Sequence, residues 1–280
     1  MEAYPSPSSP SPCVIQYVSD LHVERLPVGL RARMLAAELT PAPGAQVLVL
    51  AGDVGRDCDG SLAAVLEHVA PRWAHVVYVP GNHEYYGNEE HPPREFGAVD
   101  DAVAALVGVY GNVHLLTPEQ PTWGTEDGRV TFVGCTLWSD VDTKASGLYA
   151  GYGDFACTVA TPAFLKALHH RHKTALAAAL AGLVAGSAED SGPAPTKVVV
   201  VTHHMPSLRL VAAKYRGLGA KLSCFASPCE WLFPGVAAWV YGHTHETNTQ
   251  VMDGGCLCAV NAFGYPGENA AYDRAAVLAL

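Results

Sequence analysis

Short apolar runs rich in β-branched residues recur along the chain, and segments of helical character separate them. Five of these runs are short enough and apolar enough to be buried strands, and they span residues 13–19, 46–51, 75–79, 197–204 and 236–243. Helical patterns lie between the early runs, over residues 29–39, 61–70 and 94–110. Strands that alternate with helices in this way are typical of an α/β layered fold.

The second half of the chain predicts further elements and one irregular segment. Additional strands are expected at residues 113–116, 129–138, 247–253 and 255–263. A long helix rich in Ala and Leu is expected at residues 161–186, and a weakly helical stretch at residues 208–215. Residues 139–160 are rich in Gly, Asp and Tyr without periodicity. We expect a long loop or cap near a functional site there, because long loops inside compact domains are usually functional.

Together these elements predict two packed mixed β-sheets flanked by helices, which is a four-layer α/β/β/α sandwich. The chain has no internal repeat and no linker, so we expect residues 13–280 to form a single domain. Pro and Ser dominate residues 1–12, which we expect to be a disordered tail. A surface loop is expected at residues 186–196.

Charge and hydropathy narrow the classes of partner. The 280 residues include 27 Asp and Glu against 17 Lys and Arg, a net charge of -10, which argues against a nucleic-acid groove because phosphate backbones favour a basic face. There is no run of eighteen apolar residues, so we expect no membrane span. The N-terminal residues lack the basic patch and apolar core of a secretory signal, so we expect a cytoplasmic protein whose eight cysteines are reduced thiols.

Candidate metal ligands directly follow five of the buried strands. They occur in the segments SDLH, LAGD, PGNHE, VTHH and YGHTH, and the residues are Asp20, His22, Asp53, Asn82, His203, His243 and His245. Open α/β sheets build their sites at the ends of the strands, so we expect these side chains to converge on a binuclear metal centre. Carboxylate and imidazole ligands without a thiolate suit Mn, Zn, Fe or Co. A glycine precedes Asp53, Asn82 and His243, where a missing Cβ lets backbones approach closely.

The five motifs, in this order, resemble those of the calcineurin-like metallophosphoesterase superfamily, and the resemblance extends from Gln16 to Asn261. The sequence around these motifs is similar to that of a group of small members of the superfamily whose substrates are mostly unassigned. The resemblance implies a hydrolase of phosphoric esters, either monoesters or diesters, in which a hydroxide that bridges two divalent cations attacks phosphorus. It assigns Asp20, His22 and His245 to one cation and Asn82, His203 and His243 to the other. By the same resemblance Asp53 bridges both cations, and His83 is the general acid.

Residues beside the motifs are candidates for supporting roles. We expect His204 to lie behind His203 or to be structural, and Glu84 to anchor the PGNHE loop by hydrogen bonds. Arg56 is interpreted as solvated surface, with bidentate binding of substrate phosphate as the alternative. Protein-phosphatase members of the superfamily carry an Asp where this chain has Arg56, so the carboxylate partner of His83 is either missing or displaced to Asp57. This weakens an interpretation as a protein phosphatase.

Other aromatic residues and histidines have weaker patterns. His169 and His172 share one face of the helix expected at residues 161–186, and we interpret that face as polar surface, with one histidine lining the substrate cleft as the alternative. Tyr85, Tyr86 and Trp138 follow the motifs and form either a pocket wall or core packing.

Two other functional classes are considered beside the enzyme. A non-catalytic interaction scaffold is the alternative, although a full ligand set with His83 retained argues against it. A DNA nuclease is disfavoured by the acidic charge balance. For the enzyme, we expect a small phosphorylated substrate, with nucleotides among the candidates, and the sequence indicates neither the metal nor the oligomeric state.

Overall fold

The computed structural model describes residues 12–149, 151–186 and 196–280. The expected tail at residues 1–12 lies outside the described residues except for Pro12, and so does most of the expected loop at residues 186–196. All eight cysteines are free thiols. Within the described parts of the chain, no helix is both long enough and apolar enough to cross a bilayer.

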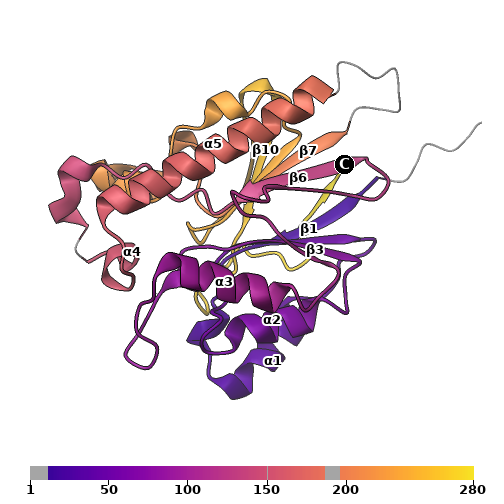
Figure 1. Ribbon diagram of the computed structural model, residues 1–280. Coiled ribbons are helices and arrows are strands. Elements are labelled where there is room, and N and C mark those ends of the chain that lie inside the picture. Colours follow the sequence, from indigo (N-terminus) through magenta and orange to yellow (C-terminus); the bar gives the residue numbers. More distant parts are fainter. Residues whose placement is uncertain (1–11, 150, 187–195) are drawn as a thin grey trace, which may run out of the picture.

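Two mixed sheets form the centre of the molecule (Figure 1). The first has the order β11-β1-β2-β3-β4, and its strands are β1 Val14–Val18, β2 Val47–Ala51, β3 His75–Val79, β4 Val113–Leu115 and β11 Val277–Ala279. The second has the order β5-β6-β7-β8-β10-β9, and its strands are β5 Thr122–Gly124, β6 Val130–Cys135, β7 Lys197–Thr202, β8 Ala238–Tyr241, β9 Thr247–Val251 and β10 Leu257–Asn261. Parallel pairs make up the interior of both sheets, and β11, β5 and β9 pair antiparallel at the edges.

Helices cover the outer face of each sheet, so the predicted α/β/β/α sandwich is confirmed (Figure 1). The first sheet carries α1 Val28–Glu38, α2 Ser61–Val69 and α3 Phe96–Val107, and the second carries α5 Pro162–Gly186. A short helix, α4 Gly153–Ala156, lies in the irregular segment before α5. The short 3-10 helices are η1 Val23–Arg25, η2 His83–Tyr85, η3 Thr143–Leu148, η4 Leu208–Leu210, η5 Ala213–Cys224, η6 Glu230–Leu232 and η7 Asp253–Gly255.

The alternation of side chains along each strand explains why both sheets are buried on two faces. In β2 all five residues are buried. Val47, Val49 and Ala51 pack into the cluster shared by the two sheets, whereas Leu48 and Leu50 pack into the cluster beneath α1, α2 and α3. A continuous apolar run is therefore what a strand covered on both sides requires.

The strand expected at residues 129–138 ends early, at Cys135. Leu137 and Trp138 have positive φ values of 69° and 53°, which no strand can accommodate. His169 and His172 on α5 hold this turn in place: Nδ1 of His169 lies 3.0 Å from the carbonyl of Leu137, and Nδ1 of His172 accepts from its N–H at 3.2 Å. The polar-surface interpretation of His169 and His172 is therefore wrong, since both are buried against this segment.

Candidate metal centre

The seven proposed ligands converge from both sheets. Asp20 and His22 follow β1, Asp53 follows β2 and Asn82 follows β3, all in the first sheet. From the second sheet, His203 follows β7, while His243 and His245 follow β8. A bridge between Ser19 and Ala262 joins β1 to β10 beside the site, which brings the two strand edges together. Side chains remote in the sequence therefore meet where the carboxyl ends of parallel strands from two sheets adjoin.

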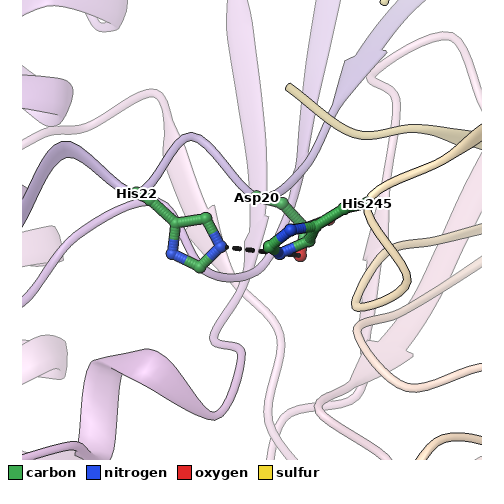
Figure 2. Close-up of side chains that lie close together, drawn as sticks. All are labelled: Asp20, His22 and His245. Carbon is green, nitrogen blue, oxygen red and sulfur yellow. Dashed lines mark hydrogen bonds and ion pairs between the residues drawn. The ribbon is translucent and has the colours of Figure 1, made fainter. Parts of the chain in front are cut away.

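Asp20, His22 and His245 form the first cluster, and their ligand atoms lie within 4.8 Å of one another (Figure 2). The Nε2 atoms of the two histidines are 2.9 Å apart, and Nε2 of His245 is 3.6 Å from Oδ1 of Asp20. Asp20 and His22 are buried.

The second cluster contains Asp53, His203 and His243, again with ligand atoms within 4.8 Å. Oδ1 of Asn82 joins them, 2.9 Å from Nε2 of His203 and 3.1 Å from Nδ1 of His243. Asp53 lies between the clusters: its Oδ1 is 3.3 Å from Nε2 of His203, and its Oδ2 is 3.8 Å from Nε2 of His22.

Hydrogen-bond acceptors point at one another in this site, which is the arrangement a cation requires. Carboxylate oxygens of Glu24 and Glu268 lie 3.0 Å and 2.6 Å from Nδ1 of His22 and His245, so each Nδ1 donates, and in the neutral rings each Nε2 presents a lone pair. These two lone pairs face each other at 2.9 Å. The donor set and its convergence therefore fit a pair of divalent cations.

The charge of Asp53 favours a cation in the second cluster. In the second cluster Nδ1 of His203 lies 2.8 Å from the carbonyl of Ala51, so its Nε2 also faces the oxygens of Asp53 and Asn82. Burial lowers the pKa of His203, but the Asp53 carboxylate outweighs burial and raises this pKa to about 10. The Asp53 carboxylate therefore favours positive charge at this position.

Backbone geometry sets this site apart from the rest of the chain. Asp20, His22, Asp53, His243 and His245 all have positive φ, between 47° and 74°, in the region that non-glycine residues rarely adopt. Only two other non-glycine residues, Leu137 and Trp138, share this conformation among the described residues. Strain of this kind persists where the surrounding structure enforces it, typically at functional sites.

The close approach expected at the glycines is present. A Cβ on Gly81 would lie 2.1 Å from Oδ1 of Asp53, and one on Gly52 would lie 2.4 Å from Nδ1 of His203. Glu84 ties the same loops together, because its carboxylate accepts hydrogen bonds from the N–H groups of Asp53, Val54 and Gly81 at 2.9 to 3.1 Å. Glu84 is therefore placed to anchor the loops after β2 and β3 to each other.

His83 faces the site, and its carboxylate partner is Glu24. The backbone N–H of His83 donates to Oδ1 of Asp53 at 2.8 Å, and Nδ1 of its ring lies 3.0 Å from Oε1 of Glu24. Burial alone raises the pKa of Glu24, yet the hydrogen bonds from His22 and His83 lower it to about 2. The side-chain carboxylate that contacts the ring of His83 is therefore Glu24.

Two expectations about the segment after Asp53 are wrong. Asp57 is not the displaced partner of His83, because it pairs with Arg94 at 2.5 Å. Arg56 is not solvated surface, because it is 7% exposed. Its guanidinium donates to Oδ2 of Asp59 at 2.8 and 3.1 Å and to the carbonyl of Tyr86 at 3.2 Å, so it is engaged within the protein.

His204 packs behind the second cluster. Its ring is tilted against that of His243, with 4.3 Å between the ring centroids. The backbone N–H of His204 donates to the carbonyl of Thr136. Of the three aromatic residues whose role was open, Tyr86 lines the cavity that contains the metal centre. Tyr85 and Trp138 are buried and line a separate cavity.

The cavity over the metal centre has a volume of about 410 Å³. The segment expected to form a loop or cap contributes Tyr152, Gly153, Asp154 and Cys157 to its wall. Oδ1 of Asp154 accepts from Nδ2 of Asn82 at 2.9 Å, which turns the amide oxygen of Asn82 toward the two histidines. The irregular segment thus both shapes the cavity and orients a proposed ligand.

Sequence reasoning missed Glu24, Asp154 and Glu268, which hold the nitrogen atoms of proposed ligands. Glu24 had a signal, since it lies two residues after His22 in DLHVER. Glu268 lies in the segment FGYPGEN after the last strand of the second sheet, and Asp154 lies in the aperiodic segment. Neither has a spacing that relates it to a ligand, so only the fold brings them to the site.

Comparison with known proteins extends these observations. The model of the calcineurin-like phosphoesterase family matches residues 15–247. An uncharacterized protein of Acanthamoeba polyphaga mimivirus is 24% identical over 284 residues, which cover 91% of this chain and 92% of that protein. The acyl-carrier-protein phosphodiesterase PptH of Mycobacterium tuberculosis is 27% identical over 288 residues, which cover 90% of this chain and 78% of PptH.

Solved structures share the fold. The crystal structure of the phosphopantetheinyl hydrolase PptH from Mycobacterium tuberculosis has a TM-score of 0.66 at 24% identity and covers 91% of each chain. A dimetal phosphatase from Danio rerio has a TM-score of 0.52 at 12% identity, covering 90% of this chain and 87% of that chain. At these identities the likeness shows a common architecture of two sheets between helices.

Proposed function

This chain belongs to the calcineurin-like phosphoesterase family and hydrolyses phosphoric ester bonds, and from that premise we propose a two-metal mechanism for its reaction. Asp20, His22 and His245 hold one divalent cation in this proposal. Asn82, His203 and His243 hold the other, and Asp53 contacts both. The observation that carries the proposal is the convergence of carboxylate and imidazole ligand atoms in two adjoining clusters with the Asp53 carboxylate between them.

Two divalent cations, when bound, would neutralise charge on the phosphate and lower the pKa of the attacking water. His83 faces the same cavity, with its Nε2 4.0 Å from Oδ2 of Asp53. In the reaction the oxygen of water bonds to phosphorus, and the bond from phosphorus to the leaving oxygen breaks. A proton from Nε2 of His83 goes to that oxygen, and the proton released by the water restores His83, so the products are an alcohol and a phosphate.

The wall of the cavity supports a substrate with an organic arm. Tyr152, Tyr215, Phe225 and Tyr265 line it, and Arg25 lies over the ring of Tyr265 with 5.5 Å from its guanidinium carbon to the ring centroid. Aromatic walls bind amphipathic groups, and the exposed Arg25 offers a cation to a phosphate. Because one relative is named an acyl-carrier-protein phosphodiesterase and phosphopantetheinyl hydrolase, phosphopantetheinyl diesters are the first substrates to test, followed by nucleotides.

Activity after reconstitution with metal tests the proposal. Protein loaded with Mn, Zn or Fe is expected to hydrolyse aryl phosphates or bis-aryl phosphodiesters. The substitution Asp53→Ala should lower the rate by about 100-fold or more, because a shared ligand supports several kcal/mol of transition-state stabilisation. Asp101→Ala, an exposed carboxylate on α3, is the matched control and should leave the rate unchanged.

The same assay distinguishes the enzyme from the scaffold. A panel of phosphopantetheinyl diesters, phosphomonoesters, cyclic nucleotides and dinucleotides identifies the preferred ester. Inert protein with all three metals across this panel would contradict the proposal, as would equal activity in Asp53→Ala and the wild type.

A further inference from the structure

Glu24 joins two histidines that have different proposed roles. Its side chain is 3% exposed, within η1, and its Oε1 lies 3.0 Å from Nδ1 of His22 and 3.0 Å from Nδ1 of His83. One oxygen atom therefore serves a proposed metal ligand and the proposed general acid together. No other carboxylate contacts either Nδ1 among the described residues, since Asp57 is paired with Arg94.

The two hydrogen bonds fix which nitrogen of each ring faces the reaction. A carboxylate only accepts hydrogen bonds, so Nδ1 of each ring must carry the proton. The Nε2 of His22 then presents its lone pair toward the first cluster, 2.9 Å from Nε2 of His245. The Nε2 of His83 points into the cavity, 4.0 Å from Oδ2 of Asp53, where a second proton, carried on Nε2 by the cationic ring, would pass to a leaving group.

The geometry near Glu24 leaves the rings little freedom to turn. The ring centroids of His22 and His83 are 4.4 Å apart in an edge contact, and the ring of Tyr86 covers His83 at 4.3 Å. Since both rings donate a hydrogen bond to the same oxygen of Glu24, a movement of that carboxylate with either imidazole changes the hydrogen bond to the other.

We propose that Glu24 is a positioning residue that orients His83 for proton donation and His22 for metal binding, an inference that rests on the proposed two-metal hydrolysis. The residue acts through the two histidines and does not itself contact the substrate.

The test separates these two effects with Glu24→Gln, which keeps the shape but removes the negative charge. An amide oxygen in the place of Oε1 accepts from both rings more weakly than a carboxylate does, and a turned amide presents its N–H group to both. The affinity for Mn should fall by about 10- to 100-fold, as it does when the partner of a metal-bound histidine is removed. At saturating Mn, kcat for alkyl and phenyl phosphates should fall by about 10- to 100-fold, whereas kcat for 4-nitrophenyl phosphate should fall only a few-fold. A good leaving group needs no proton, so only the poor leaving groups report on His83.

Glu268→Gln is the matched control. Glu268 accepts from Nδ1 of His245 at 2.6 Å. Among the described residues, its side chain makes no hydrogen bond or ion pair with His83. It should weaken Mn binding while the dependence on the leaving group stays as in the wild type. Equal loss on all leaving groups in Glu24→Gln, or the same leaving-group pattern in Glu268→Gln, would overturn the role of Glu24 in orienting His83.

A double-mutant cycle tests whether Glu24 acts through His83. With His83→Asn as the background and Mn saturating, the further change Glu24→Gln should cost no more than a few-fold. Losses that multiply in full would refute the coupling. If Glu24→Gln fails to fold, as judged by its thermal transition, Glu24→Asp is measured instead, because its shorter carboxylate ends short of both rings and should give the same pattern.

The outcomes distinguish this inference from the proposed function. An inactive wild type with every metal removes the two-metal proposal and this inference with it. If the wild type is active, Asp53→Ala is inactive and Glu24→Gln lowers kcat equally for all leaving groups, only the inference about Glu24 is overturned. The proposed function then still stands.

Discussion

The substitution Gly81→Ala should displace Asp53 from the metal centre without altering any proposed ligand. A Cβ on Gly81 would lie 2.1 Å from Oδ1 of Asp53 and 2.5 Å from its backbone nitrogen. The second contact is with main chain, so rotation of the Asp53 side chain cannot relieve it. The φ of Gly81 is not in the left-handed region, so the effect of alanine comes from the contact alone.

The size of the effect follows from these distances. Ordinary contact begins at 3.4 Å, so Oδ1 of Asp53 and the new methyl group must move apart by about 1 Å. A misplacement of about 1 Å in a catalytic arrangement can lower the rate about 100-fold. Forcing one carbon into a packed site also costs about 1–3 kcal/mol of folding free energy.

The assay measures bound metal per chain, the rate on an aryl phosphate and the free energy of unfolding in urea. The matched control is Gly97→Ala in α3, where a Cβ meets nothing within 4 Å. This control should retain full activity and gain about 0.5–1 kcal/mol of stability, because alanine favours a helix over glycine. Two metals per chain and a rate within two-fold of the wild type in Gly81→Ala would refute the steric argument.

Three further predictions concern residues around the site. In metal-free protein the stability should fall as the pH drops from 6 to 4, because burial lowers the pKa of His172 to about 3 and the unfolded chain therefore binds the proton first. The substitution His172→Asn should remove about 1.4 kcal/mol per pH unit from the slope of stability against pH, measured by urea unfolding. An unchanged slope would contradict this. Arg56→Met should cost about 1–3 kcal/mol in urea unfolding, since Oδ2 of Asp59 loses its two hydrogen bonds from the guanidinium, and Arg56→Lys should recover part of the loss. Glu84→Ala should cost about 3 kcal/mol or more and reduce bound metal, as three backbone N–H groups lose their acceptor, whereas a loss below about 1 kcal/mol would show that the loops do not depend on it.

The proposed ligands could be identified from the sequence because each directly follows a buried strand. An apolar run that ends in Asp, Asn or His specifies both the strand and the edge where its last residue lies, and parallel pairing then brings such edges together. Asp20 after β1 and His243 after β8 illustrate this, since the N–H of His243 donates to Asp20 across 223 residues of chain.

Supporting residues could not be identified in this way, because their positions depend on turns. Glu24 reaches His83 because His22 adopts a φ of 47° and a short 3-10 helix follows, and no pattern in the sequence specifies that turn. His169 and His172 were expected on a polar surface because α5 was considered alone. The irregular turn at Leu137 covers both histidines. Because the sequence of this turn is apolar, it was expected to continue the preceding strand.

The origin of the ligands in two different sheets has a consequence for metal loading. Asp20 and His22 belong to one sheet and His245 to the other, and the second cluster is divided between the sheets in the same way. The first ion to bind would therefore connect the two sheets where their edges adjoin, and the second would enter a site that is already ordered. Loading should accordingly be cooperative, with stability rising more steeply with free metal concentration than the RT ln(1 + [L]/Kd) of a single site.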